Sequence, residues 1–217
     1  MIVTAAQGVT LIGGGAVTAD DLALALPRAP VVVSADGGAD TALAHGLMPA
    51  AVIGDFDSIS AQARAAIPAD RQHPIAEQDS TDFAKCLARV AAPFFLGVGF
   101  SGPRLDHALS ALTVLVGEPR PVVLIGGEDI AFAAPPDLAL DLPPGSRVSL
   151  WPLGAVSGRS EGLEWPIDGL RLAPDGRTST SNRATGPVRL RLSGPAVVIL
   201  PRAALGAALV ALGVRAR

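Results

Sequence analysis

Ala51-Val52-Ile53-Gly54-Asp55-Phe56-Asp57-Ser58 has the pattern of a short buried strand that ends in two carboxylates. A similar pattern precedes it, because the apolar run Val31-Val32-Val33 leads into Ser34-Ala35-Asp36-Gly37-Gly38. Such apolar runs alternate with segments of helical period between residues 9 and 125. This alternation predicts an α/β fold, with a mostly parallel sheet and flanking helices. Open α/β sheets bind ligands at the carboxyl ends of their strands.

The pattern changes after Gly127. Pro135-Pro136 and Pro143-Pro144 introduce short extended runs, separated by Gly and Pro, that continue to Ile199. Short strands with frequent turn signals predict a small antiparallel β-sandwich. We therefore expect an α/β domain over residues 1–133 and an all-β domain over residues 134–217, with a terminal helix over residues 203–212.

Composition narrows the class of protein and its partners. With 49% hydrophobic and 17% charged residues, the 217-residue chain has the composition of a folded protein. The net charge is −3 and no run of Lys or Arg occurs, so no nucleic-acid partner is expected. The single cysteine, Cys86, excludes an intrachain disulfide and fits a reducing compartment. No signal peptide and no apolar run of membrane-spanning length are recognised, so we expect a cytoplasmic protein with no membrane partner.

The pair Asp55 and Asp57 points to a bound cation. Residues two apart in an extended strand lie on one face, so these carboxylates would repel each other unless a cation lies between them. Mg²⁺ fits this description, because in phosphoryl chemistry it is usually held by one or two carboxylates and the substrate's phosphates. A plain polar turn or helix cap explains the same two residues when they are considered alone.

A second polar segment, Gln78-Asp79-Ser80-Thr81-Asp82, leads into a predicted helix. Ser80 or Thr81 is a suitable N-cap, and apolar residues recur at helical spacing from Phe83 to Val90, so one helix face packs inward. Lys85 lies one turn after Asp82 and either pairs with it or reaches a phosphate. Taken alone, a solvated surface pair is the favoured interpretation of Lys85.

Two glycine-rich turns each join a predicted strand to a predicted helix. At Asp36-Gly37-Gly38 the glycines allow close approach of a ligand, and the helix N-terminus favours anions. Gly97-Val98-Gly99-Phe100-Ser101-Gly102 matches the dinucleotide fingerprint G-x-G-x-x-G, with Glu128 placed as the ribose acid. A dinucleotide-binding oxidoreductase is therefore an alternative function, although it leaves the acidic residues unexplained and Pro103 follows the last glycine.

Two further functions fit the acidic residues. A phosphatase would use Asp55 as the nucleophile and Asp57 as the acid. A non-catalytic module would bind a nucleotide without turning it over. Other chemistries are poorly supported, because the chain has no P-loop motif and its three histidines lack the spacing of a zinc site.

Taken together, five segments resemble, in order, the motifs of the thiamine pyrophosphokinase family. The resemblance covers about residues 9–200 and rests on the following segments: Ser34-Ala35-Asp36-Gly37-Gly38-Ala39, Gly54-Asp55-Phe56-Asp57-Ser58-Ile59, Gln78-Asp79-Ser80-Thr81-Asp82-Phe83-Ala84-Lys85, Gly102-Pro103-Arg104-Leu105-Asp106-His107 and Ser179-Thr180-Ser181-Asn182. Five motifs in one order are far more specific than any one of them.

This resemblance implies a nucleotide-binding α/β domain followed by a β-sandwich, in a homodimer with the thiamine site near the subunit interface. It also implies Mg²⁺-dependent transfer of diphosphate from ATP to the hydroxyl of thiamine, with release of AMP. The catalytic and metal-binding residues it implies are Asp55, Asp57 and Asp82. The residues it places along the nucleotide and phosphates are Asp36, Gly37, Gly38, Gln78, Thr81, Lys85, Arg104 and Asp106. Those it places at the thiamine pyrimidine are Ser179, Ser181 and Asn182.

Three features depart from the family's pattern. Pro103 stands where a second glycine is expected, and Arg183 follows Asn182 where bacterial members often carry an acidic residue. The helical tail after Pro201 is an addition. Trp165 is a neighbour of the thiamine segment in this resemblance, but a lone Trp in a strand more often fills a core.

Overall fold

The computed structural model describes residues 1–102 and 104–214. Within it the chain forms two compact units. Unit 1 comprises Met1–Val114 with Leu124–Gly126, and unit 2 comprises Leu115–Val123 with the chain from Gly127 onward. The chain passes between the units more than once, so the single domain boundary expected after residue 133 stays a prediction.

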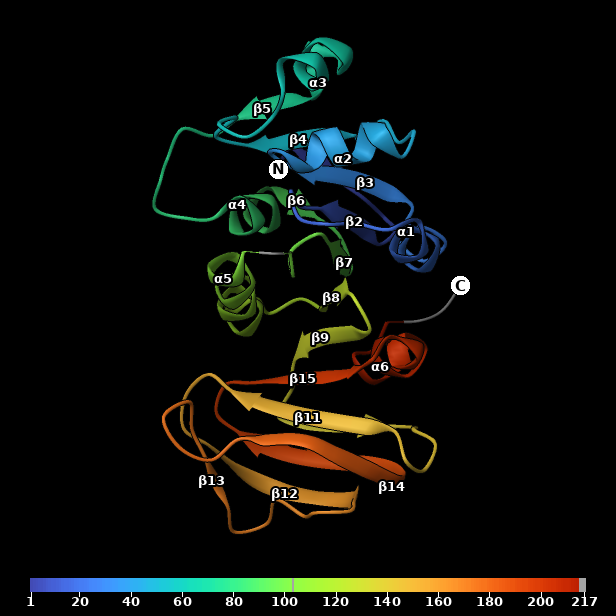
Figure 1. The fold of residues 1–217 in the computed structure, drawn as a ribbon, viewed down its shortest axis with the longest axis vertical. Coiled ribbons are helices and arrows are strands. Elements are labelled where there is room, and N and C mark those ends of the chain that lie inside the picture. Colours follow the sequence, from blue (N-terminus) through green and yellow to red (C-terminus); the bar gives the residue numbers. More distant parts are fainter. Residues whose placement is uncertain (103, 215–217) are drawn as a thin grey trace. The chain divides into compact units, whose positions relative to one another are not determined.

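A parallel sheet lies at the centre of unit 1 (Figure 1). Its strand order is β8-β7-β2-β3-β4-β5, and the paired strands from β7 to β5 run parallel. The strands are β2 (Val9–Ile12), β3 (Val31–Ala35), β4 (Ala51–Gly54), β5 (Gln72–Pro74), β7 (Phe95–Val98) and β8 (Val122–Gly126). Every residue of β2, β4 and β7 is buried, so both faces of these strands are covered. The predicted parallel sheet is confirmed.

Helices connect these strands and pack on the sheet. They are α1 (Ala19–Ala25), α2 (Gly38–Ala44), α3 (Ala61–Ala66), α4 (Asp82–Arg89) and α5 (Leu105–Gly117), with a 3-10 turn η1 (Ala69–Arg71) and a parallel pair of short strands, β1 (Val3–Thr4) and β6 (Val90–Ala91). Helix α2 packs on β2 and β3, and α4 packs on β3 and β4. Thr18 caps α1 and Thr81 caps α4, since each hydroxyl accepts a backbone N–H from its first turn, and Thr81 is one of the two N-caps predicted for α4.

Two glycines allow the ends of β2, β3 and β4 to approach one another closely. A Cβ on Gly38 would lie 2.0 Å from the carbonyl oxygen of Ile12, so only glycine fits where α2 begins. A Cβ on Gly54 would lie 2.6 Å from the Asp36 Cβ. The turn after β3 is therefore held against the end of β4, which is immediately followed by Asp55.

Antiparallel strands build unit 2, as predicted. Their order is β13-β12-β14-β11-β15-β9, with β10 also paired to β14. The elements are β9 (Asp129–Ala133), β10 (Asp137–Leu140), β11 (Arg147–Pro152), β12 (Val156–Leu163), β13 (Arg171–Leu172), β14 (Ser179–Ser193), β15 (Ala196–Pro201), the 3-10 turn η2 (Arg202–Ala204) and α6 (Leu205–Ala211). Strand β14 pairs with β11 near its start and with β10 along its second half, so it links two layers of strands (Figure 1). Helix α6 is the expected terminal helix. Among the described residues, no helix is long and apolar enough to cross a membrane.

Candidate active site

Three carboxylates gather in unit 1 beyond the carboxyl ends of β3 and β4. Asp36, Asp55 and Asp57 each offer an oxygen atom, and these atoms all lie within 4.8 Å of one another. The backbone turns sharply to bring them together, because Asp36 has φ 41° and Phe56, between the two other acids, has φ 66°. Residues other than glycine rarely adopt this left-handed conformation, and it is enriched at functional sites. Their spacing predicted that Asp55 and Asp57 lie on one face of an extended strand, but the structure places them in a turn after β4.

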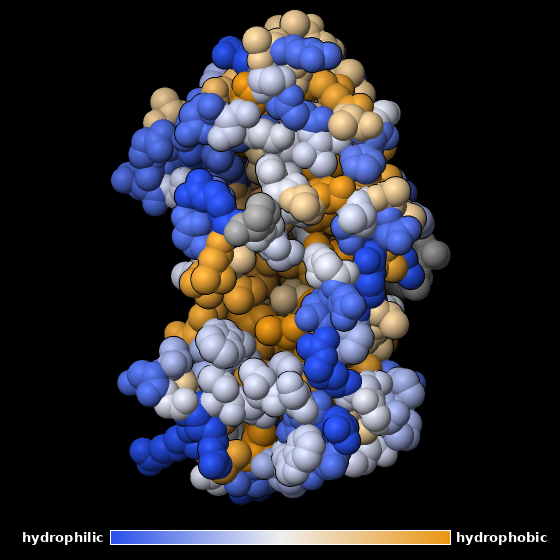
Figure 2. Space-filling view, viewed as in Figure 1, coloured by the Kyte–Doolittle hydropathy of each residue, from blue (hydrophilic) through white to orange (hydrophobic). Residues whose placement is uncertain are grey.

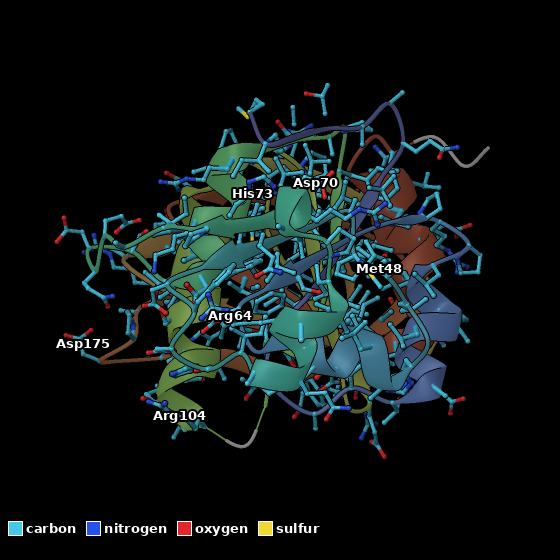
Figure 3. All side chains as sticks on the ribbon, turned by 90° about the horizontal axis from the view of Figure 1, so that it is seen from above. Met48, Arg64, Asp70, His73, Arg104 and Asp175 are labelled. Carbon is cyan, nitrogen blue, oxygen red and sulfur yellow. The ribbon has the colours of Figure 1, made fainter. Side chains whose placement is uncertain are left out.

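Phe56 anchors the turn that carries Asp55 and Asp57. Its ring packs against a buried apolar cluster that includes Val52 and Ile59, and the Arg64 guanidinium carbon lies 5.5 Å from the ring centroid. Figure 3 labels Arg64 on the helix beside this part of the sheet. The apolar residue between the acids therefore packs into unit 1, while the carboxylates on either side remain available to a ligand.

Asp36 is the most buried of the three acids, at 2% exposure. Its Oδ2 accepts a hydrogen bond from the Ser58 backbone N–H at 3.0 Å, whereas Oδ1 has no partner among the described residues. Burial raises the pKa of Asp36 to about 6, and the neighbouring Asp57 and Asp82 carboxylates add to the rise. A buried, unpartnered carboxylate oxygen beside two further carboxylates suits a hard divalent cation such as Mg²⁺.

The raised pKa of Asp36 predicts a pH dependence of the metal-free protein's stability. A carboxyl whose pKa is about 6 when folded and 3.8 when unfolded binds its proton more tightly in the folded state, so stability falls as pH rises through 6. Between pH 5 and pH 7.5 this group should remove about 1 kcal/mol from the free energy of unfolding. Asp36→Asn should lack this loss in urea unfolding with EDTA, while Asp70→Asn should keep it. Equal pH dependence in both variants would contradict the assignment.

Asp55 is held by donors on both of its oxygens. Gln78 donates to Oδ2 at 2.9 Å, the Asp57 backbone N–H donates to Oδ1 at 3.3 Å, and the Lys85 ammonium lies 3.5 Å from Oδ2. The hydrogen bond from Gln78, helped by Asp57 N–H and Lys85, lowers the pKa of Asp55 against the opposing effect of burial. Asp55 is therefore ionised and fixed in orientation at neutral pH.

Lys85 is buried at 2% exposure, so the surface-pair interpretation of its sequence is wrong. Its ammonium lies 3.0 Å from Asp82 Oδ1 as well as 3.5 Å from Asp55 Oδ2. Burial lowers the pKa of Lys85, but the contacts with Asp82 and Asp55 outweigh it and raise the pKa overall. The apolar spacing of α4 did not reveal this, because Lys85 points toward the acids at the sheet end and not toward solvent.

Asp82 lies beside the three-carboxylate group without belonging to it. It begins α4 immediately after the N-cap Thr81, and Lys85 joins it to Asp55. The predicted metal set of Asp55, Asp57 and Asp82 therefore stays a prediction, while the geometry adds Asp36 as a candidate ligand.

Arg104 and Asp106 pair with each other at the start of α5. Their side chains lie 2.6 Å apart and are 67% and 65% exposed, and Arg104 points outward in Figure 3. Their predicted contacts with phosphate stay predictions. Pro103, which departs from the family's pattern, lies outside the described part of the chain.

The glycines of the dinucleotide-like segment have a packing role. A Cβ on Gly99 would lie 2.7 Å from the carbonyl oxygen of Gly13, and a Cβ on Gly102 would lie 2.9 Å from the Gly15 Cα. The segment thus packs backbone to backbone against the loop after β2. Close chain packing accounts for these glycines without a dinucleotide.

The residues predicted to contact thiamine lie in unit 2, around the start of β14. The Asn182 side-chain amide accepts from the Trp165 backbone N–H at 3.2 Å and donates to the Trp165 carbonyl at 2.7 Å. Ser181 has φ 58°, and its backbone N–H donates to Ser149 Oγ at 3.0 Å. Ser179 pairs with Leu150 at the end of this ladder. Asn182 therefore fixes the backbone of Trp165 in addition to any role toward a substrate.

Trp165 is 52% exposed, so the interpretation of this residue as core is wrong. It lies in a bend after β12, outside the strands, and the Arg183 guanidinium carbon lies 5.8 Å from its ring centroid. Arg183 also lies 3.7 Å from the Glu164 carboxylate. Unit 2 thus displays an aromatic face flanked by charge beside Asn182.

The parallel sheet, the antiparallel β region and the three carboxylates define a protein of the α/β-plus-all-β class, with an acidic site at the carboxyl edge of its parallel sheet. Residues 22–123 match the family model described as "Thiamin pyrophosphokinase, catalytic domain". These residues are assigned to the catalytic domain of the thiamin pyrophosphokinase family. The resemblance recognised in the sequence motifs is thereby confirmed.

Solved structures share the fold of this chain. The chain is similar to thiamin pyrophosphokinase from Candida albicans, with a TM-score of 0.77 and 18% identity over 90% of this chain and 89% of that chain. It is also similar to the enzyme from Bacillus subtilis, with a TM-score of 0.73 and 22% identity over 90% and 99% of the two chains. The yeast enzyme gives a TM-score of 0.74 and 16% identity over 92% and 88%. Among curated proteins, none matches this chain.

Proposed function

We propose that the chain transfers diphosphate from ATP to the hydroxyl of thiamine, giving thiamine diphosphate and AMP. The observation that carries this proposal is the group of Asp36, Asp55 and Asp57, with Lys85 buried beside it, at the ligand-binding edge of a catalytic domain of this family. Such transfer depends on positioning and charge neutralisation more than on a protein nucleophile. The unit 1 site supplies both cationic and anionic groups for this purpose.

In the reaction, the thiamine hydroxyl oxygen forms a bond to the β-phosphorus of ATP, and the bond from that phosphorus to the oxygen of AMP breaks. Asp55, Asp57 and Asp82, with Asp36, would hold Mg²⁺, which when bound neutralises charge on the polyphosphate. Lys85 fixes the orientation of Asp55 and Asp82 through its contacts with both carboxylates. The hydroxyl proton passes to a carboxylate, for which Asp57 and Asp82 are the candidates.

The remaining polar residues of unit 1 would line the nucleotide. Gly37 and Gly38 bring the start of α2 close to the acids, and Gln78 orients Asp55. Thr81, Arg104 and Asp106 would contact the phosphates, as the family resemblance implies. For Arg104 this role requires its exposed guanidinium to leave Asp106 and take a phosphate in its place.

Unit 2 would bind thiamine through the residues around the start of β14. Ser179 and Ser181 would offer hydroxyl groups to thiamine. Asn182 holds the backbone of Trp165, whose exposed indole would stack on an aromatic ring of thiamine. The acidic surroundings of the unit 1 carboxylates favour the cationic thiazolium of thiamine. A homodimer with the thiamine site near its subunit interface remains part of the proposal, and sedimentation analysis of the purified protein would test it.

The proposed function is tested by the nucleotide product. Incubation with thiamine, ATP and Mg²⁺ should release AMP and form thiamine diphosphate in equal amounts, as separated by ion-exchange chromatography. Production of ADP with thiamine monophosphate would indicate transfer of a single phosphoryl group. Reduction of NAD with no requirement for Mg²⁺ would favour the alternative oxidoreductase at Gly97–Gly102.

A further inference from the structure

Glu77 organises the loop between β5 and α4, which carries Gln78, Thr81 and Asp82 into the site. Figure 2 shows hydrophilic side chains gathered over this loop. The Glu77 Oε2 accepts from the backbone N–H groups of Asp79 at 2.9 Å and Ser80 at 3.1 Å. Its Oε1 accepts from Ser80 Oγ at 2.6 Å. One carboxylate thus satisfies three donors within three residues of its own position.

These three contacts fix the part of the chain on which the site depends. Gln78 lies directly after Glu77 and reaches Asp55 Oδ2 at 2.9 Å. Thr81 lies directly after Ser80 and caps α4, which begins with Asp82. Without the Glu77 contacts, the N–H groups of Asp79 and Ser80 would turn to water and the spacing between Gln78 and Asp82 would no longer be fixed.

We propose that Glu77 is a positioning residue, which folds the 77–81 loop so that Gln78 orients Asp55 and Thr81 delivers Asp82 to Lys85. This inference rests on the proposed function of the same site, but its geometric part does not depend on turnover. The hydrogen bonds from the Ser80 hydroxyl and from the Ser80 and Asp79 N–H groups lower the pKa of Glu77. The Glu77 carboxylate is therefore ionised when it accepts them. Glu77 touches none of the three carboxylates of the group, so its effect is exerted through Gln78 and the start of α4.

Two substitutions separate hydrogen bonding from charge. Glu77→Ala removes all three contacts. Glu77→Gln removes the negative charge but can keep the contacts, because its amide oxygen can accept both backbone N–H groups while its NH2 donates to Ser80 Oγ. Glu161→Ala, on the exposed side of β12, is a control of the same residue type outside the site.

The experiment measures amide hydrogen exchange and Mn²⁺ binding in the full chain, followed by turnover of ATP and thiamine. In Glu77→Ala we expect the Asp79 and Ser80 amides to exchange at least about tenfold faster, Mn²⁺ affinity to fall about tenfold and kcat to fall about 100-fold. Glu77→Gln should stay within about threefold of the parent protein in all three measurements, in line with the hydrogen bonds it retains. Glu161→Ala should match the parent protein.

Parent-like exchange and Mn²⁺ affinity in Glu77→Ala would overturn the proposal. It would also be overturned if Glu77→Gln were impaired in Mn²⁺ affinity as strongly as Glu77→Ala, because charge and not loop geometry would then be the cause. If Glu77→Ala fails to fold, Ser80→Ala takes its place, with about threefold faster exchange of the Ser80 amide expected and an unchanged rate contradicting the proposal. Failure of the proposed function is recognised separately, since the parent protein itself would then form no AMP.

Discussion

Asp55→Asn is expected to lower kcat/KM for diphosphate transfer about 1000-fold, which corresponds to roughly 4 kcal/mol of lost transition-state stabilisation. The substitution removes the charge of the carboxylate that lies between Gln78, Lys85 and the two other acids. The fold should persist, since the amide introduced by the substitution can still accept from Gln78 and Lys85 keeps its contact with Asp82. Steady-state assays of AMP release and a thermal melt measure the two effects.

A matched control distinguishes this loss from a general effect of removing an acid. Asp175→Asn lies on the exposed surface of unit 2 and should leave kcat/KM within about twofold, as expected of an exposed substitution. Near-normal activity of Asp55→Asn would remove Asp55 from the site. Trapping a phosphoryl group on Asp55 in the parent protein would instead favour the phosphatase alternative, in which Asp55 is a nucleophile.

Lys85→Met is expected to lower both activity and stability. Asp55 and Asp82 lose the cation that lies 3.5 Å and 3.0 Å from them, so their orientation is no longer fixed and kcat should fall about 100-fold. Removing one partner of a buried ion pair leaves the other charge uncompensated. Because Asp82 is 30% exposed, we expect a loss of only about 2 kcal/mol in the free energy of unfolding at pH 7.

The pH dependence of this stability term has a definite sign. The pKa of Lys85 is raised in the folded protein above its ordinary value of 10.5, so its contribution is complete below pH 10.5 and is lost as pH rises through the folded pKa. The difference between the parent protein and Lys85→Met should therefore be constant from pH 7 to pH 9 in urea unfolding. Arg89→Met, on the same helix, is the control and should cost less than about 1 kcal/mol. Equal stability losses in the two variants would contradict the buried pairing of Lys85.

Much of unit 1 could be predicted from local sequence. The apolar runs at Val9–Ile12 and Val31–Val33 form strands because each is buried on both faces, and the glycines that follow permit the close turns observed. The acids after β3 and β4 gather because parallel strands end at the same edge of a sheet. Both conclusions need only the period of the apolar residues and the positions of glycine.

The errors concern residues whose surroundings come from distant parts of the chain. Lys85 has the spacing of a surface residue on α4, but Asp55, from the turn after β4, joins Asp82 of the same helix in pairing with it at a buried position. Trp165 is exposed because Asn182, from β14, holds its backbone in a bend. Asp36 joins the carboxylate group only because Gly54 leaves room for it. Glu77 precedes Asp79 by two residues and Ser80 by three, and a carboxylate at this spacing can accept their backbone N–H groups. This local pattern could have identified Glu77.

The destination of the β- and γ-phosphates of ATP tests the central claim most directly. Phosphorus-31 NMR of the protein with ATP, thiamine and Mg²⁺ should show the ATP signals replaced by one AMP singlet and the two coupled signals of thiamine diphosphate, in equal amounts. Loss of these products in Asp55→Asn would connect the reaction to the carboxylate site. Formation of ADP or free phosphate in place of AMP and thiamine diphosphate would contradict diphosphate transfer.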